Sequence, residues 1–121
     1  MNTLSEQKAR KALLEGIEFC RRHQLSPNRS GNLSLRCDQG WLITPSGVPD
    51  DKVGVDDLVL MPAARSAGGR KPSSEAPMHG AVYDRYPEVH SVVHCHSAWA
   101  TALACLRRPI PPFHYMIAVA G

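Results

Sequence analysis

The chain has 121 residues, of which 43% are hydrophobic and 21% charged, values ordinary for one globular domain. Its formal net charge of +3 comes from scattered basic residues rather than a dense basic stripe, so we expect no nucleic-acid partner. The N-terminal segment is charged throughout, no apolar run approaches membrane-spanning length, and the four cysteines form no CxxC pair. These features predict a cytoplasmic protein with reduced thiols and no membrane partner.

The first half of the chain predicts one helix followed by short strands. An apolar repeat close to 3.6 residues predicts a helix over residues 4–24. Residues 33–37 and 41–45 lie on either side of an Asp-Gln-Gly turn and predict a β-hairpin. Residues 57–62 predict a third strand that ends at a proline.

The second half predicts a helix, a strand and a further helix. Residues 73–87 predict the first of these helices, with a serine as its N-cap and Glu75 in its first turn. Residues 88–96 form the clearest strand pattern, and residues 97–108 predict the next helix. Residues 113–121 begin another apolar element, with no following segment in this chain to cover it.

Two histidines in the predicted strand are candidate metal ligands. Side chains alternate along a strand, so His94 and His96 project together, with Cα atoms about 6.5 Å apart, while Cys95 points away. That spacing suits two ligands of one Zn²⁺, but it also fits an ordinary strand end, which is the commoner case. Glu75 is similarly open to two interpretations, as a member of a capping box or as a functional carboxylate.

Two turn sequences could form part of an anion site. Residues 29–32 (RSGN) and 44–47 (TPSG) each combine a glycine with small polar side chains. Such turns supply backbone N–H groups and hydroxyls, which are the donors an anion cradle uses. Taken singly, each motif indicates only a turn.

The ordered set of motifs resembles the class II aldolase/adducin family. The segments are SGNLSLR, WLITPSGVPDDKV, the stretch from PSSE to the HxH motif formed by His94 and His96, and IPPFHYMIAVAG. Together they run from about residue 30 to residue 121. The resemblance implies an α/β fold with three α/β/α layers around a mainly antiparallel sheet. It also implies that residues 1–121 form a single domain that is incomplete at its C-terminus. In the family, a third metal-binding histidine lies beyond this point.

The resemblance implies a role for each matching residue. His94 and His96 match two zinc ligands, and Glu75 matches the carboxylate that approaches the metal and acts as acid and base. Tyr115 matches a tyrosine that reaches a neighbouring subunit's site and donates a proton, which implies a homo-oligomer, often a tetramer in the family. The positions that match a cradle for the phosphate of a sugar phosphate are Gly31, Asn32, Ser46, Gly47, Ser73 and Ser74.

The reaction implied is zinc-dependent, reversible aldol cleavage of a ketose phosphate through an enediolate. We expect a carboxylate with a raised pKa to remove the proton. Glutamate at position 75 favours an aldolase over the family's 4-epimerases, which usually carry aspartate there. A sugar-phosphate 4-epimerase or a dehydratase of the same family, and a non-catalytic, adducin-like interaction module, are the alternatives, and we do not expect this chain to turn over alone.

Two other histidines are given no catalytic role. His79 follows Glu75 by four residues on one predicted helical face, and we expect it to pack or to support a metal ligand indirectly. His90 shares a strand face with the HxH pair, but the nearby Pro87 places it at the solvent end of that strand.

Overall fold

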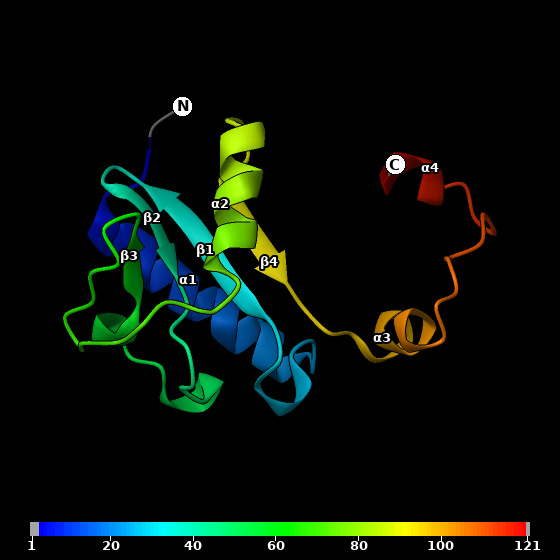
Figure 1. The fold of residues 1–121 in the computed structure, drawn as a ribbon, viewed down its shortest axis with the longest axis horizontal. Helices are drawn as coiled ribbons and strands as arrows, with labels where there is room; N and C mark the ends of the chain where they lie inside the picture. The colour runs from blue at the N-terminus through cyan, green and yellow to red at the C-terminus, as the bar shows by residue number, and fades with distance from the viewer. Residues whose placement is uncertain (1–2, 121) are drawn as a thin grey trace.

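The centre of the fold is a four-stranded antiparallel sheet, seen in a computed structural model that describes residues 3–120 (Figure 1). The strands lie in the order β3-β2-β1-β4, with bounds β1 Asn32–Cys37, β2 Gly40–Ile43, β3 Val59–Met61 and β4 Ser91–His94. The predicted hairpin is confirmed, since β1 and β2 pair from Ser34 opposite Ile43 to Cys37 opposite Gly40. The predicted third strand is confirmed as well.

Helices cover both faces of this sheet and complete the three layers. The helical bounds are α1 Glu6–Arg22, α2 Ala76–Arg85, α3 Ala98–Cys105 and α4 Ile117–Ala120. α1 packs on one face and α2 on the other, so the α/β/α arrangement implied by the resemblance is confirmed. Among residues 3–120, no helix combines the length and the apolar character needed to cross a membrane.

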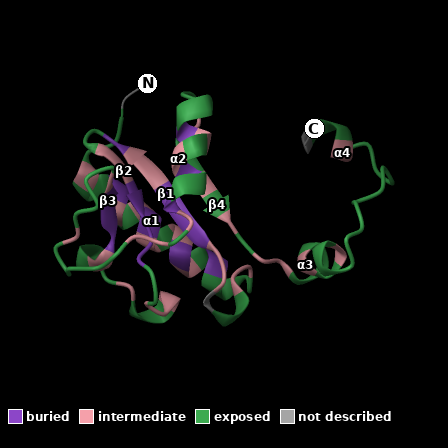
Figure 2. Ribbon diagram, in the orientation of Figure 1, coloured by how far each residue is buried: buried purple, intermediate pink, exposed green. Residues whose placement is uncertain are grey.

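Alternation of side chains along the strands divides the core into two clusters. Leu33 and Leu42 project toward α1 and join its buried apolar stripe. Ile43 and Val59 project from the opposite face and pack with Ala76 of α2. The buried residues therefore lie within the sheet and along the helix faces that meet it (Figure 2).

Leu42 provides a direct test of this core, because its side chain is fully buried. We expect Leu42→Ala to lower the free energy of unfolding by about 2–5 kcal/mol, from lost apolar burial and the cavity left behind. Leu106→Ala is the matched control, since Leu106 is 68% exposed. Urea unfolding should show a change for the control within about 0.5 kcal/mol; equal losses in both variants would contradict the packing described.

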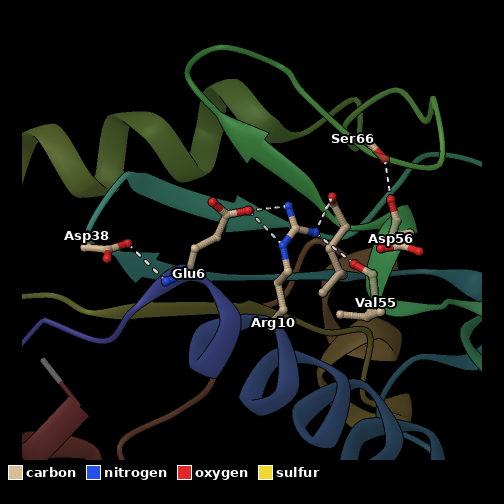
Figure 3. Close-up of polar contacts among 7 residues, drawn as sticks. Glu6, Arg10, Asp38, Val55, Asp56 and Ser66 are labelled. Atoms are coloured by element: carbon tan, nitrogen blue, oxygen red, sulfur yellow. Dashed lines mark hydrogen bonds and ion pairs between the residues drawn. The ribbon is translucent and has the colours of Figure 1, made fainter.

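Arg10 ties α1 to the segment that leads into β3 (Figure 3). Its Nε and Nη2 donate to Oε1 of Glu6, one helical turn earlier, at 2.8 and 2.6 Å. Its Nη1 donates to the carbonyl oxygens of Val55 and Leu58, at 2.8 and 3.0 Å. One guanidinium group thus satisfies two loop carbonyls and fixes where β3 begins relative to the helix.

Residues 95–120, which we call the C-terminal arm, extend away from the sheet after β4 (Figure 1). Its aromatic side chains are largely exposed, with Trp99 at 87%, Phe113 at 75% and Tyr115 at 77% (Figure 2). The apolar element expected over 113–121 is the short helix α4, and its last residue, Gly121, lies outside the described residues.

Two predicted elements are shorter than expected, and both carry or adjoin residues of the site. The helix expected over 73–87 begins at Ala76, because Pro77 is tolerated only within the first turn, and Glu75 is its N-cap residue. The strand expected over 88–96 spans only Ser91–His94. Its pairing with β1 ends where Asn32 lies opposite His94, so His96 falls beyond the strand.

Candidate active site

Glu75 lies where the start of α2 meets the ends of two strands. Asn32 and His94 are paired across β1 and β4, so both side chains project from the face of the sheet that α2 covers. Oε2 of Glu75 accepts hydrogen bonds from Nδ2 of Asn32 and from Nδ1 of His94, the latter at 2.7 Å. Three segments that are distant in the sequence therefore meet at one carboxylate oxygen.

The two histidines of the HxH motif are neighbours, although only the first belongs to the strand. The ring centroids of His94 and His96 are 4.8 Å apart, with the planes inclined by 45°. Oε2 of Glu75 can only accept when it is ionised, so Nδ1 of His94 carries the hydrogen. In the neutral ring this leaves the lone pair on Nε2, which is the form of imidazole that binds a metal.

The protonation of Glu75 differs from the sequence-based expectation. The hydrogen bond from Asn32 and, after it, the contact with His94 lower the pKa of Glu75, and burial opposes them only in part. The expected raised pKa is therefore wrong for this arrangement, and Glu75 is a carboxylate at neutral pH. Its Oε1 makes no hydrogen bond within residues 3–120, and the side chain is 40% exposed, so this oxygen is free to accept a proton.

A row of buried polar side chains continues behind Asn32. Nε2 of His79 lies 2.5 Å from Oδ1 of Asn32, and its Nδ1 lies 2.6 Å from Oγ of Ser34. Oγ of Ser34 is in turn 2.7 Å from the hydroxyl of Tyr83. The expectation that His79 packs is confirmed, because it is fully buried. No sequence pattern singles out Ser34 or Tyr83, because their contacts depend on the packing of α2 against β1.

Burial of His79 predicts a pH dependence of stability. Burial holds the pKa of His79 below its usual value of 6.5. As the pH falls below 6.5, the unfolded chain binds a proton that folded His79 does not, so the free energy of unfolding should fall, by up to about 1.4 kcal/mol per pH unit. The fall ends once the pH passes below the depressed pKa of the folded state. Urea unfolding at several pH values measures this fall in the free energy of unfolding.

His79→Gln should remove this component of the pH dependence, whatever its effect on stability at neutral pH. His90→Gln is the matched control, because His90 is exposed just before β4 and should leave the component intact. The same slope below pH 6.5 in His79→Gln as in the unaltered chain would show that another group is responsible.

The residues matched to a phosphate cradle divide between two hollows. Gly31, Asn32 and Gly47 line a small cavity of about 90 Å³ between the ends of β1 and β2. Gly31 has φ of +91°, and a Cβ there would lie 2.5 Å from the carbonyl oxygen of His94, so only glycine fits. Gly47 has φ of +73° and an open space beside it. Both glycines therefore occupy backbone conformations that favour glycine.

Ser73 and Ser74 line a groove beside α2, in a segment that pairs with Thr44 and Pro45 of the cavity lining. The backbone N–H of Ser73 donates to the carbonyl oxygen of Thr44, and the backbone N–H of Ser46 donates to the carbonyl oxygen of Lys71. Both of these N–H groups are therefore already hydrogen-bonded. Oγ of Ser73 accepts from the N–H of Glu75 at 3.3 Å. The segment that carries Ser73 and Ser74 is therefore held against the turn that carries Ser46 and Gly47.

The small cavity also contains groups that the sequence analysis did not single out. Asp50 lines it, and burial, with the neighbouring Asp51, raises the pKa of its carboxyl group. Ser26 lines it too, and its buried hydroxyl has no hydrogen-bond partner within the described part of the chain. A phosphate bound there would lie beside a carboxyl group of raised proton affinity and a hydroxyl able to donate.

Tyr115 is not part of this cluster. It lies in the C-terminal arm with its ring stacked near His114, at 4.5 Å between centroids, and is 77% exposed. Figure 1 places the segment just before α4 well away from the junction of α2 and β4. Within one copy of the chain, Tyr115 does not reach Glu75.

The residues present fit part of a zinc site. Two adjacent imidazoles, one with its tautomer fixed by a carboxylate, are suitable zinc ligands. Within residues 3–120, however, no group of three or more His, Cys, Asp or Glu side chains is arranged to hold a metal ion. A catalytic zinc normally has three protein ligands, so a third would have to come from outside these residues.

The fold and site together define a class of protein: an α/β/α domain with a carboxylate at a helix start facing two histidines at a strand end. The same class emerges from comparison with known proteins. Residues 12–121 match the family model described as class II aldolase and adducin N-terminal domain. The chain belongs to the class II aldolase and adducin family.

Relatives and solved structures agree with this assignment. The chain is 46% identical over 98 residues to a 5-methylthioribulose-1-phosphate/5-deoxyribulose-1-phosphate aldolase of Rhodospirillum rubrum, covering 80% of this chain and 44% of that protein. It is 42% identical over 98 residues to an L-fuculose phosphate aldolase of Escherichia coli O6:H1, covering 80% and 46%. A solved L-fuculose 1-phosphate aldolase superposes with a TM-score of 0.82 and 35% identity, covering 93% of this chain and 55% of that one. The chain spans about half the length of these relatives.

Proposed function

We propose that this chain supplies part of the active site of an aldolase that reversibly cleaves a ketose phosphate. The observation that carries the proposal is the contact of Glu75 with His94, beside His96. One side of this cluster is a carboxylate with a free oxygen, and the other is a pair of imidazoles suited to a metal. The relatives named above are aldolases of sugar phosphates, which supports the same reaction class.

In this proposal each residue has a separate task. Glu75 takes a proton through Oε1 from the methylene carbon next to the carbonyl group of the ketone phosphate, and returns a proton to that carbon after cleavage, while Asn32 and His94 hold Oε2. His94 and His96 would hold Zn²⁺, which when bound supplies Lewis-acid stabilisation of the negative charge that develops on proton removal. The weak basicity of Glu75 makes that stabilisation necessary, because its pKa is lowered.

The substrate's phosphate is assigned to the cavity lined by Gly31, Asn32 and Gly47. Ser46 lies in the adjoining turn, and Ser73 and Ser74 would join the cradle from the segment before α2, which is hydrogen-bonded to that turn. Binding of a phosphate at a distance from the reacting carbon would hold that carbon near Glu75.

Tyr115 is proposed to act in the site of another copy of the chain, within a homo-oligomer. Its exposure in the C-terminal arm, away from its own Glu75, is consistent with this role. In that position its phenol would donate a proton to the aldehyde oxygen when the carbon–carbon bond forms, and its phenolate would take that proton back in cleavage.

A combined metal and exchange measurement tests the proposed function. The protein is purified without chelator, its zinc content and oligomeric size are measured by native mass spectrometry, and exchange of the methylene hydrogens of dihydroxyacetone phosphate with D₂O is followed by NMR. We expect bound zinc and exchange that is lost on chelation and restored by zinc. A folded protein that takes up no zinc and shows no exchange would instead favour a non-catalytic interaction module.

A further inference from the structure

The buried polar row behind the carboxylate joins Tyr83, Ser34, His79 and Asn32. We infer that Tyr83, Ser34 and His79 form a directional hydrogen-bond chain that holds the Asn32 amide with its NH₂ group against Glu75. Among the described residues, no side-chain hydrogen bond joins these three residues to the two histidines of the HxH motif, and none of the three lines the cavity assigned to phosphate. They would act on the site only through Asn32, as positioning residues.

The direction follows from the number of hydrogens available. His79 is fully buried, and burial lowers its pKa, so the ring is neutral and carries one N–H. If Nε2 carries it, His79 donates to Oδ1 of Asn32, and Nδ1 must accept from the hydroxyl of Ser34. The hydroxyl of Ser34 is then committed as a donor, so the hydroxyl of Tyr83 must donate to Oγ of Ser34.

The reverse direction is electrostatically unfavourable at Glu75. If Nδ1 of His79 carried the hydrogen, Nε2 would have to accept from the NH₂ group of Asn32. The amide would then be turned by 180°, and its carbonyl oxygen would face the carboxylate oxygen of Glu75. Two acceptors would be in contact without a hydrogen between them, in a partly buried site where such repulsion is poorly screened.

The far end of the chain is fixed as firmly as the near end. Tyr83 is only 3% exposed, and the guanidinium carbon of Arg36 lies 4.5 Å from the centroid of its ring. Nη2 of Arg36 also donates to the carbonyl oxygen of Tyr83 at 2.6 Å. Burial raises the pKa of Tyr83, so its phenol keeps the hydrogen that begins the chain. A side chain held in this way is a fixed donor to Oγ of Ser34.

The consequence for catalysis depends on the proposed function. Asn32 would present a fixed donor to Oε2 of Glu75 and leave Oε1 as the oxygen that handles the proton. The chain of hydrogen bonds itself needs neither metal nor substrate, so it can be tested separately from the reaction.

NMR of the ¹⁵N-labelled protein without added metal provides that test. Long-range ¹H–¹⁵N correlation identifies which ring nitrogen of His79 is protonated, and we expect Nε2–H. Hydrogen exchange of the Asn32 side-chain amide is measured in the unaltered protein and in Ser34→Ala, which removes the donor to Nδ1. We expect exchange about tenfold faster in Ser34→Ala, because one buried hydrogen bond of the chain is lost.

Two controls separate this effect from general loosening of the fold. Tyr83→Phe leaves the hydroxyl of Ser34 able to donate to His79, so the Nε2–H form should persist. Ser91→Ala removes an exposed hydroxyl from β4 and should change neither measurement. An Nδ1–H tautomer in the unaltered protein, or unchanged Asn32 exchange in Ser34→Ala, would overturn the inference. If the NMR results are as expected but the unaltered protein shows no substrate exchange, the result counts against the proposed reaction and not against the hydrogen-bond chain.

Discussion

Glu75→Gln is expected to abolish exchange of the methylene hydrogens of dihydroxyacetone phosphate, in a preparation where the native sequence shows it. Glutamine is nearly the same size and cannot take up the proton, so the loss should reach about 10²–10⁴-fold, the range for a general base. Zinc content should be retained, because an amide oxygen can still accept hydrogen bonds from Asn32 and His94.

The matched control is Glu88→Gln. Glu88 is an exposed glutamate between α2 and β4, and the same chemical change there should leave exchange unaltered. If Glu75→Gln keeps its exchange rate while binding zinc normally, Glu75 is not the base and the proposed mechanism fails at its first step.

His94→Ala should lower the affinity for zinc by at least about 100-fold. Loss of an outer-shell partner alone typically costs 10–100-fold in metal affinity, so removal of a ligand should exceed that range. The substitution also takes away one of the two donors to Oε2 of Glu75, so substrate exchange should fall with metal content. Zinc titration with a competing chelator measures the affinity.

His90→Ala serves as the control for this experiment. His90 precedes β4 and is exposed, and only its backbone carbonyl is used, by the N–H of Arg36. Its replacement should leave zinc affinity within about twofold of the native value, the scale of typical surface substitutions. Native zinc affinity in His94→Ala would remove the two-histidine site from consideration.

Much of the fold could be predicted from local sequence, because local patterns determine it. The apolar repeat around Leu13 and Ile17 predicts α1, and the Asp-Gln-Gly turn predicts the hairpin with the pairing observed. The start of α2 was predicted too early, because serines that make good N-caps precede a proline that limits where the helix begins.

The site was only partly predictable, for a physical reason. Glu75, His94 and His96 could be singled out from their spacing and from the family resemblance, and the structure places them together. The lowered pKa of Glu75 could not, because it depends on Asn32, which lies 43 residues earlier and reaches the carboxylate through the pairing of β1 with β4. No pattern within either segment reports that contact.

The anchoring of Glu75 by one oxygen has a stereochemical consequence. With Oε2 held by two donors, the carboxylate offers its other oxygen from a fixed direction. In the proposed reaction, a substrate anchored by its phosphate would present one prochiral hydrogen to that oxygen and turn the other away. Deuterium should therefore enter the methylene group with a single handedness, and racemic labelling would mean that the carboxylate is free to swing.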